Sequence, residues 1–109
     1  MLTDEVRYKM LKVIQLNPEI SQRDVARELD ISLGKVNYCL NALIERGLVK
    51  VTNFKNSENK SAYMYLLTTR GVKDKARVTG RFLKRKIQEY EDLRTEIEAI
   101  RIDARREQT

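Results

Sequence analysis

Polar residues of several kinds gather between Gly34 and Asn41, in a pattern that suits contact with a polyanion. Lys35 carries a cation, Asn37 and Asn41 carry carboxamides four residues apart, and Tyr38 carries a phenol. A lysine can pair with a phosphate, and an asparagine can donate to and accept from an adenine edge in the major groove. Gly34 lets another backbone approach closely. These residue types favour hydrogen-bonded recognition of duplex DNA.

The same segment has the apolar spacing of a helix with one buried face. Apolar residues recur at i, i+4, i+7 and i+8, which places them on one side of a helix over residues 33–46. The polar residues fall on the opposite side, so we expect them to face solvent. For Lys35 the alternative is an ordinary solvated surface lysine. The predicted buried face consists of Val36, Leu40, Leu43 and Ile44.

A shorter helix is expected just before this one, and the turn Asp30–Ser32 joins the two. Two helices linked by so short a turn commonly present the second one to a major groove. Ser32 is the expected N-terminal cap of the second helix and also a candidate DNA-binding residue, and Gly47 is the expected stop. Ser21, Gln22 and Arg23 open the first of the pair, where amides and a guanidinium can reach a backbone phosphate. For Ser21, capping with Asp24 is the alternative, and both roles are compatible.

Strand-like and helical patterns surround this pair. A first helix is expected between Thr3 and Asn17–Pro18. After Gly47, two β-branched or aromatic runs, 48–54 and 62–67, flank a polar stretch and predict a β-hairpin, the wing. Tyr63 and Tyr65 of the second run are expected to pack in the core rather than to stack on unpaired RNA bases. At the wing tip, Lys55, Asn56 and Lys60 are candidates for phosphate or minor-groove contact, with a solvated loop as the alternative.

A long helix is expected from Thr69 almost to the end of the chain. Its apolar residues recur every 3.5 positions on average, the period of a coiled-coil seam, which predicts association with a second copy. Gly80 is a candidate kink or break within this helix. The predicted dimer interface consists of Leu83, Ile87, Tyr90, Leu93, Ile97, Ile100 and Ala104.

Charge is distributed unevenly along the chain. The formal net charge is +6, which favours a polyanionic partner. Residues 70–86 hold eight Lys or Arg against one acid, and residues 87–109 hold four against seven. The basic run can attract DNA, pair with the acidic half of a neighbouring chain, or simply form a solvated helix with internal ion pairs. We divide the chain into a DNA-binding domain, 1–68, and a dimerisation arm, 69–109.

Several classes of function find no support in the composition. Histidine is absent, and no nucleophile stands beside a base, so no catalytic site, metal site or cofactor is expected. The single cysteine, Cys39, is expected to be a structural thiol, and a redox role would need exposure and a lowered pKa. No apolar run predicts a signal peptide or a membrane span, so we expect a cytoplasmic protein. No small-molecule effector is assigned.

The sequence resembles bacterial MarR-type winged helix-turn-helix regulators, and most closely the subgroup of exopolysaccharide (EPS)-associated transcriptional regulators. The resemblance implies DNA binding as a homodimer, with the recognition helix at 33–46 and the wing at 55–61. The segments that carry it are SQRDVAREL (21–29), ISLGKVNYCL (31–40), GLVK (47–50), YLLTTRG (65–71) and RFLKRK (81–86).

The sequence thus predicts a mainly α fold with a small β-hairpin, a winged helix-turn-helix followed by a long C-terminal helix. The predicted function is transcriptional regulation by a homodimer on double-stranded DNA, with 33–46 in the major groove and 48–67 on flanking DNA. The alternative is a protein–protein interaction adaptor that uses a winged helix and a coiled-coil arm. Salt dependence separates the two, because only DNA binding releases condensed counterions.

Overall fold

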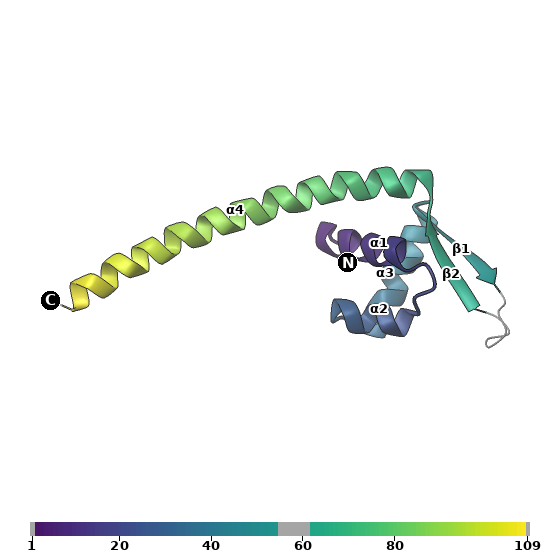
Figure 1. The fold of residues 1–109 in the computed structure, drawn as a ribbon, viewed down its shortest axis with the longest axis horizontal. Coiled ribbons are helices and arrows are strands. Elements are labelled where there is room, and N and C mark those ends of the chain that lie inside the picture. Colours follow the sequence, from purple (N-terminus) through teal and green to yellow (C-terminus); the bar gives the residue numbers. More distant parts are fainter. Residues whose placement is uncertain (1, 55–61, 109) are drawn as a thin grey trace.

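The computed structural model describes residues 2–54 and 62–108 and has the predicted fold class. Three helices and a two-stranded hairpin form a compact head, from which a single long helix projects (Figure 1). The whole molecule measures 71 × 28 × 21 Å. In chain order the elements are α1 (Asp4–Leu16), α2 (Gln22–Leu29), α3 (Leu33–Glu45), β1 (Val49–Phe54), β2 (Ala62–Leu67) and α4 (Thr69–Glu107).

Hydroxyl side chains fix where the helices begin. The side-chain oxygens of Thr3, Ser21 and Ser32 each accept a hydrogen bond, at 3.0–3.2 Å, from the backbone N–H three residues ahead. Such caps satisfy a donor that has no partner within the helix. Asp30 ends α2 in the left-handed region at φ 55°, and Gly47 follows α3 at φ 73°. The predicted capping by Ser32 and the stop at Gly47 are therefore confirmed.

The core lies where α1, α2, α3 and the hairpin meet. The predicted buried face of α3 is confirmed except at Ile44, which is only half-buried. Val6 of α1 is likewise half-buried, whereas Leu11 and Cys39 are fully buried. The core residues are Met10, Leu11, Val13, Ile14, Ile20, Val25, Val36, Cys39, Leu40, Leu43, Leu48, Val49 and Tyr65.

The hairpin pairs β1 with β2 in antiparallel register, from Val49 opposite Leu67 to Phe54 opposite Ala62. Tyr65 packs in the core as predicted, but the prediction for Tyr63 is wrong, because its side chain is 62% exposed. Tyr63 occupies the same sheet face as Tyr65 but precedes it by two residues in β2, which places it nearer the wing tip. A hydrogen bond of 2.9 Å from the Tyr65 N–H to the Pro18 carbonyl joins the hairpin to the α1–α2 loop.

The first part of α4 packs closely against the head. Gly71 lies so close to Leu48 that an added Cβ would stand 1.9 Å from the Leu48 carbonyl oxygen. Thr68, the N-cap, donates to the Gly47 carbonyl at 2.6 Å and accepts from the Gly71 N–H. Val78 is fully buried, so the contact continues for at least two turns.

Two ion pairs hold α4 against α1. Asp74 is buried and contacts Arg7 at 3.4 Å, and Arg81 makes two hydrogen bonds of 2.9 and 3.0 Å to Asp4. The bidentate bond from Arg81 lowers the pKa of the Asp4 carboxyl and raises that of Arg81 in return.

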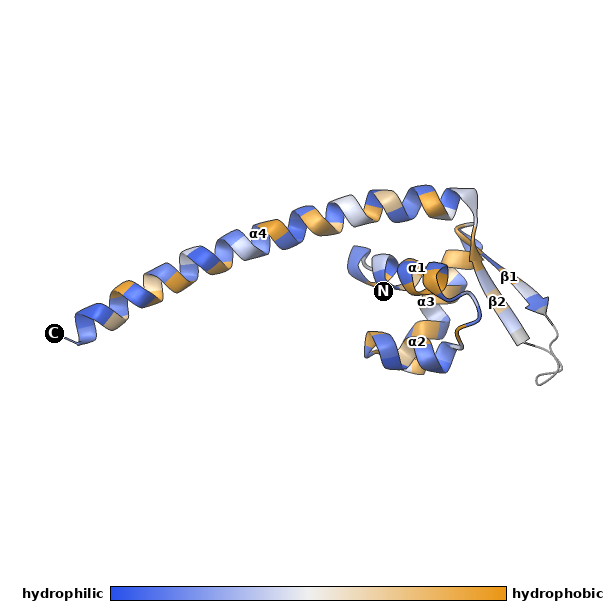
Figure 2. Ribbon diagram, viewed as in Figure 1, coloured by the Kyte–Doolittle hydropathy of each residue, from blue (hydrophilic) through white to orange (hydrophobic). Residues whose placement is uncertain are grey.

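Phe82 also contacts the head, because its ring centroid lies 5.2 Å from that of Tyr8 in α1, and the helix projects beyond it. Gly80 does not break it, since α4 runs without interruption from Thr69 to Glu107. Apolar and polar residues alternate in bands along this projecting part (Figure 2). Within the part of the chain that the structure describes, no helix combines the length and apolarity needed to cross a membrane.

Candidate nucleic-acid interface

The outer face of α3 is open to solvent, as the spacing of its residues predicted. Val36, Cys39, Leu40 and Leu43 are buried, whereas Asn37, Tyr38 and Asn41 are exposed. Tyr38 is 62% exposed although it is a large aromatic residue. The exposed residues border a shallow hollow lined by Gly34, Asn37, Tyr38, Asn41, Ala42 and Glu45. Glu45 was not among the predicted site residues, and its carboxylate stands at the C-terminal end of this hollow.

Lys35 adds an unpaired cation near the start of α3. Among the described residues no acid contacts its ammonium group, and the first turn of α3 contains no acid. A helix N-terminus carries partial positive charge, so an amine there is disfavoured unless an anion comes close. A phosphate from outside the chain would supply that negative charge and would also meet free backbone N–H groups.

A chain of carboxamides crosses this face and leads into the core. Asn41 Nδ2 donates to Asn37 Oδ1 at 3.2 Å, and Asn37 Nδ2 donates to Gln22 Oε1 at 3.2 Å. Gln22 Nε2 in turn donates to the hydroxyl of Tyr65 at 3.3 Å. Residues from α2, α3 and β2 are thus connected through their side chains, and they fix one another's rotamers.

The start of α2 lies beside this row of carboxamides. Of its three residues predicted to contact a phosphate, each has a different environment in the structure. Ser21 caps the helix through its hydroxyl, and Arg23 is exposed, with no acid paired to it among the described residues. The Gln22 side chain points toward Tyr65 and Asn37 instead of being free for a phosphate. Tyr65 itself was missed as a site residue, because its apolar neighbours in β2 indicate only a core position.

The wing tip cannot be placed relative to this face. Lys55, Asn56 and Lys60 lie outside the residues that the structure describes, so their predicted DNA contacts stay predictions. On the described part of the hairpin, Lys50 and Asn53 of β1 are exposed.

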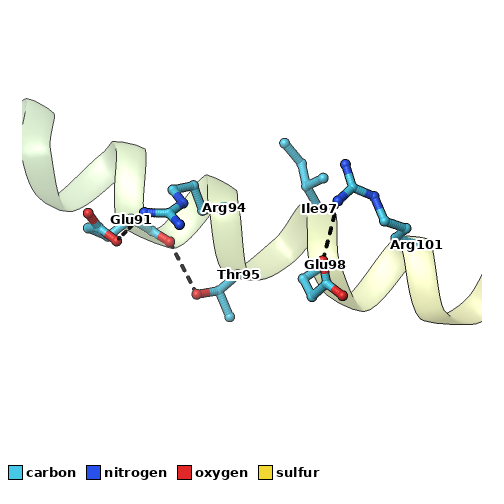
Figure 3. Close-up of a pocket in the computed structure, with 6 residues that line it drawn as sticks. All are labelled: Glu91, Arg94, Thr95, Ile97, Glu98 and Arg101. Carbon is cyan, nitrogen blue, oxygen red and sulfur yellow. Dashed lines mark hydrogen bonds and ion pairs between the residues drawn. The ribbon is translucent and has the colours of Figure 1, made fainter.

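The projecting half of α4 carries an exposed apolar stripe. The predicted interface residues from Leu83 to Ile100 are between 43% and 59% exposed, and Ala104 is also exposed. Figure 3 shows Ile97 of this stripe on one side of α4 and Thr95 on the other. Neighbouring ion pairs join Arg94 to Glu91 at 3.7 Å and Arg101 to Glu98 at 3.5 Å. The hollow in that figure is lined by one helix only and is an open groove between side chains.

Metal chemistry has no visible site in the described chain. Over residues 2–54 and 62–108, no three Asp, Glu or Cys side chains gather in a way that could hold a metal ion. Cys39 is fully buried in the core.

Comparison with known proteins identifies the fold. A family model described as winged helix-turn-helix DNA-binding matches residues 3–50. Several solved structures share the fold at low sequence identity. The PcaV transcriptional regulator from Streptomyces coelicolor, in complex with its natural ligand, is 19% identical, with a TM-score of 0.62 over 76% of this chain and 57% of that chain. FabT from Streptococcus pneumoniae, in complex with DNA, is 24% identical, with a TM-score of 0.54 over 79% and 58%.

A third structure, the zinc-dependent MarR family regulator AdcR in its Zn(II)-bound state, is 20% identical, with a TM-score of 0.56 over 88% of this chain and 62% of that chain. The chain therefore spans less than two thirds of the length of each of these three structures. No curated protein matches the sequence. The predicted winged helix-turn-helix is confirmed, and the exopolysaccharide-associated subgroup stays a prediction.

Proposed function

We propose that this protein is a MarR-type transcriptional regulator that binds duplex DNA as a homodimer, with α3 in the major groove and the wing on flanking DNA. The observation that carries the proposal is the outer face of α3, where a lysine, two carboxamides and a phenol face solvent on a helix whose other side is buried. A helix of this kind, presented by a short turn, fits the width of the major groove.

The relatives and the charge support the same function. One structure with this fold is described in complex with DNA, and others are described as transcriptional regulators. The chain has a formal net charge of +6, which attracts a polyanion over long range. Lys35 and Arg23 have no acidic partner among the described residues, so both are available to phosphates.

The test is duplex binding as a function of salt. For the wild type we expect the logarithm of the affinity to fall steeply with the logarithm of the salt concentration. Lys35→Ala should weaken binding and reduce that slope by about one, because one phosphate contact is lost. Lys12→Ala, which removes an exposed lysine from α1, is the matched control for net charge. An absence of duplex affinity, or equal slopes for Lys35→Ala and wild type, would refute the assignment of α3.

Base preference is tested separately. Asn37→Ala should relax selectivity by about 1–3 kcal/mol at one base pair, since a carboxamide that reads a base edge is lost. Unchanged selectivity in this variant would show that Asn37 does not contribute to base recognition.

The homodimer is proposed from the exposed stripe on α4. Leu83, Ile87 and Tyr90 are more than half exposed in the single chain, and a second copy of the same helix would cover them. A copy that runs in the opposite direction would bring its acidic residues 87–109 toward the basic residues 70–86. Covering this stripe would also add buried apolar area that so small a head lacks.

Ile97→Lys tests the dimer, because it places a charge in the stripe. We expect this variant to be monomeric in sedimentation at concentrations where the wild type is a dimer. Thr95→Lys puts the same charge on the opposite side of α4 (Figure 3) and should leave the dimer intact. The proposal fails if the wild type is monomeric, or if both lysine variants sediment alike.

A further inference from the structure

The hydrogen-bonded row of carboxamides, from Gln22 of α2 to Asn41 of α3, has a fixed inner end and a free outer end. Its inner end is Tyr65, which is 7% exposed and packed among core residues. The backbone of Tyr65 is held as well, because its N–H donates to the Pro18 carbonyl at 2.9 Å. The hydroxyl therefore stands at one position relative to α2 and α3.

We propose that Tyr65 is a positioning residue for base recognition, which acts through Gln22 and Asn37 to present Asn41 to an adenine. This inference rests on the proposed binding of α3 to DNA. Tyr65 does not face the groove itself, so its part is to restrain the three carboxamides. A side chain that is already ordered loses less conformational entropy when the DNA binds.

The direction of the hydrogen bonds determines what Asn41 offers. Each carboxamide in the chain donates through its nitrogen toward Tyr65, so Asn41 uses one N–H on Asn37. Its Oδ1 accepts no hydrogen bond from the described residues, and its second N–H stays available. Adenine presents the complementary pair, the N7 acceptor and the N6 donor. Guanine presents two acceptors, N7 and O6. Its O6 would face Asn41 Oδ1, and two acceptor oxygens cannot form a hydrogen bond with each other.

Asn37 has a different part in this arrangement. Its nitrogen donates to Gln22 and its oxygen accepts from Asn41, so both polar atoms are already engaged within the protein. It retains one N–H that can contact a single acceptor on a neighbouring base or phosphate. Asn41, the outermost of the three carboxamides, is the one whose oxygen and second N–H are both available to a base.

The experiment is selection of bound duplexes from a randomised pool by four full-length proteins: wild type, Asn41→Ala, Tyr65→Phe and the double variant. Asn41→Ala should lose the preference for A·T at one position of the selected sequence. Tyr65→Phe keeps the ring in the core and removes only the hydroxyl. We expect it to reduce the A·T preference at that same position by about three- to tenfold, the effect of one neutral hydrogen bond.

The double variant shows whether the effect of Tyr65→Phe on base preference passes through Asn41. If Tyr65 acts through Asn41, Tyr65→Phe should change nothing further in the Asn41→Ala background. Tyr8→Phe, which removes a hydroxyl from α1 and keeps the ring beside Phe82, should select the wild-type sequence. Thermal unfolding of each variant separates loss of selectivity from loss of fold.

The outcomes are distinguishable. If the wild type enriches no sequence, the proposed function itself fails, and this inference fails with it. If the wild type enriches a sequence but Tyr65→Phe keeps the full A·T preference, or if the two substitutions add independently, the proposed function stands and the role of Tyr65 is refuted.

Discussion

Replacement of Gly71 by alanine should detach the base of α4 from the head. The new Cβ would lie 1.9 Å from the Leu48 carbonyl oxygen and 2.9 Å from its carbonyl carbon. Both atoms belong to the backbone of the residue just before β1, so neither can rotate away as a side chain would. An ordinary van der Waals contact of a Cβ needs about 3.4 Å, and the start of α4 must therefore move by about 1.5 Å.

Such a movement would disrupt hydrogen bonds that join α4 to the head. The Thr68 N–H donates to the Leu48 carbonyl at 3.0 Å, and the Thr68 hydroxyl donates to the Gly47 carbonyl at 2.6 Å. Two lost hydrogen bonds cost about 1–3 kcal/mol, and crowding of packed atoms adds about 1 kcal/mol or more. We expect Gly71→Ala to lower the free energy of unfolding by about 2–4 kcal/mol.

Gly80→Ala is the matched control, because it makes the same change within the same helix. A Cβ at Gly80 meets no atom within 4 Å, so alanine should stabilise α4 by about 0.5–1 kcal/mol. Both variants and the wild type are compared by urea and thermal unfolding at one protein concentration, since self-association shifts the midpoint. The expected loss for Gly71→Ala corresponds to a Tm lower by about 10 °C or more. Equal midpoints for the two alanine variants would refute the close packing at Gly71.

Two further predictions concern other parts of the head. The hydrogen bonds from Arg81 lower the pKa of the Asp4 carboxyl. The ionised Asp4 therefore stabilises the fold fully above the ordinary pKa of an aspartate, and this stabilisation is lost as the pH falls through the lowered pKa. Asp4→Asn should therefore destabilise the protein near pH 7, and its difference from the wild type should vanish in strong acid, as measured by unfolding at several pH values; a constant difference would contradict this. Cys39 is fully buried, so a thiol reagent should label it at least about a hundredfold more slowly in the native protein than in urea, and rapid native labelling would show that α3 opens readily.

The faces of α3 could be predicted from the sequence because they follow from local spacing. A period of 3.6 residues separates Val36 and Leu40 from Asn37 and Asn41, whatever the rest of the fold does. The turn at Gly47 was predictable for the same reason, since the left-handed region favours glycine. Gly80 was a candidate for an interruption because glycine destabilises a helix, but α4 continues through this position.

Contacts between distant segments could not be predicted in this way. Tyr63 and Tyr65 have the same side chain and the same strand face, and only the position of the core edge distinguishes the exposed one from the buried one. The bond from Gln22 to Tyr65 joins residues 43 positions apart, so no local pattern reveals it. The carboxamide chain is therefore a property of the tertiary structure.

The unbroken course of α4 has a mechanical consequence. Because α4 is one helix of 39 residues anchored at its first turns, the head and the far end cannot bend independently. A tilt of about 5° at the anchor would displace the tip of the free arm by several ångströms, given a rise of about 1.5 Å per residue. A partner that binds the C-terminal end of α4 would therefore set the orientation of the head.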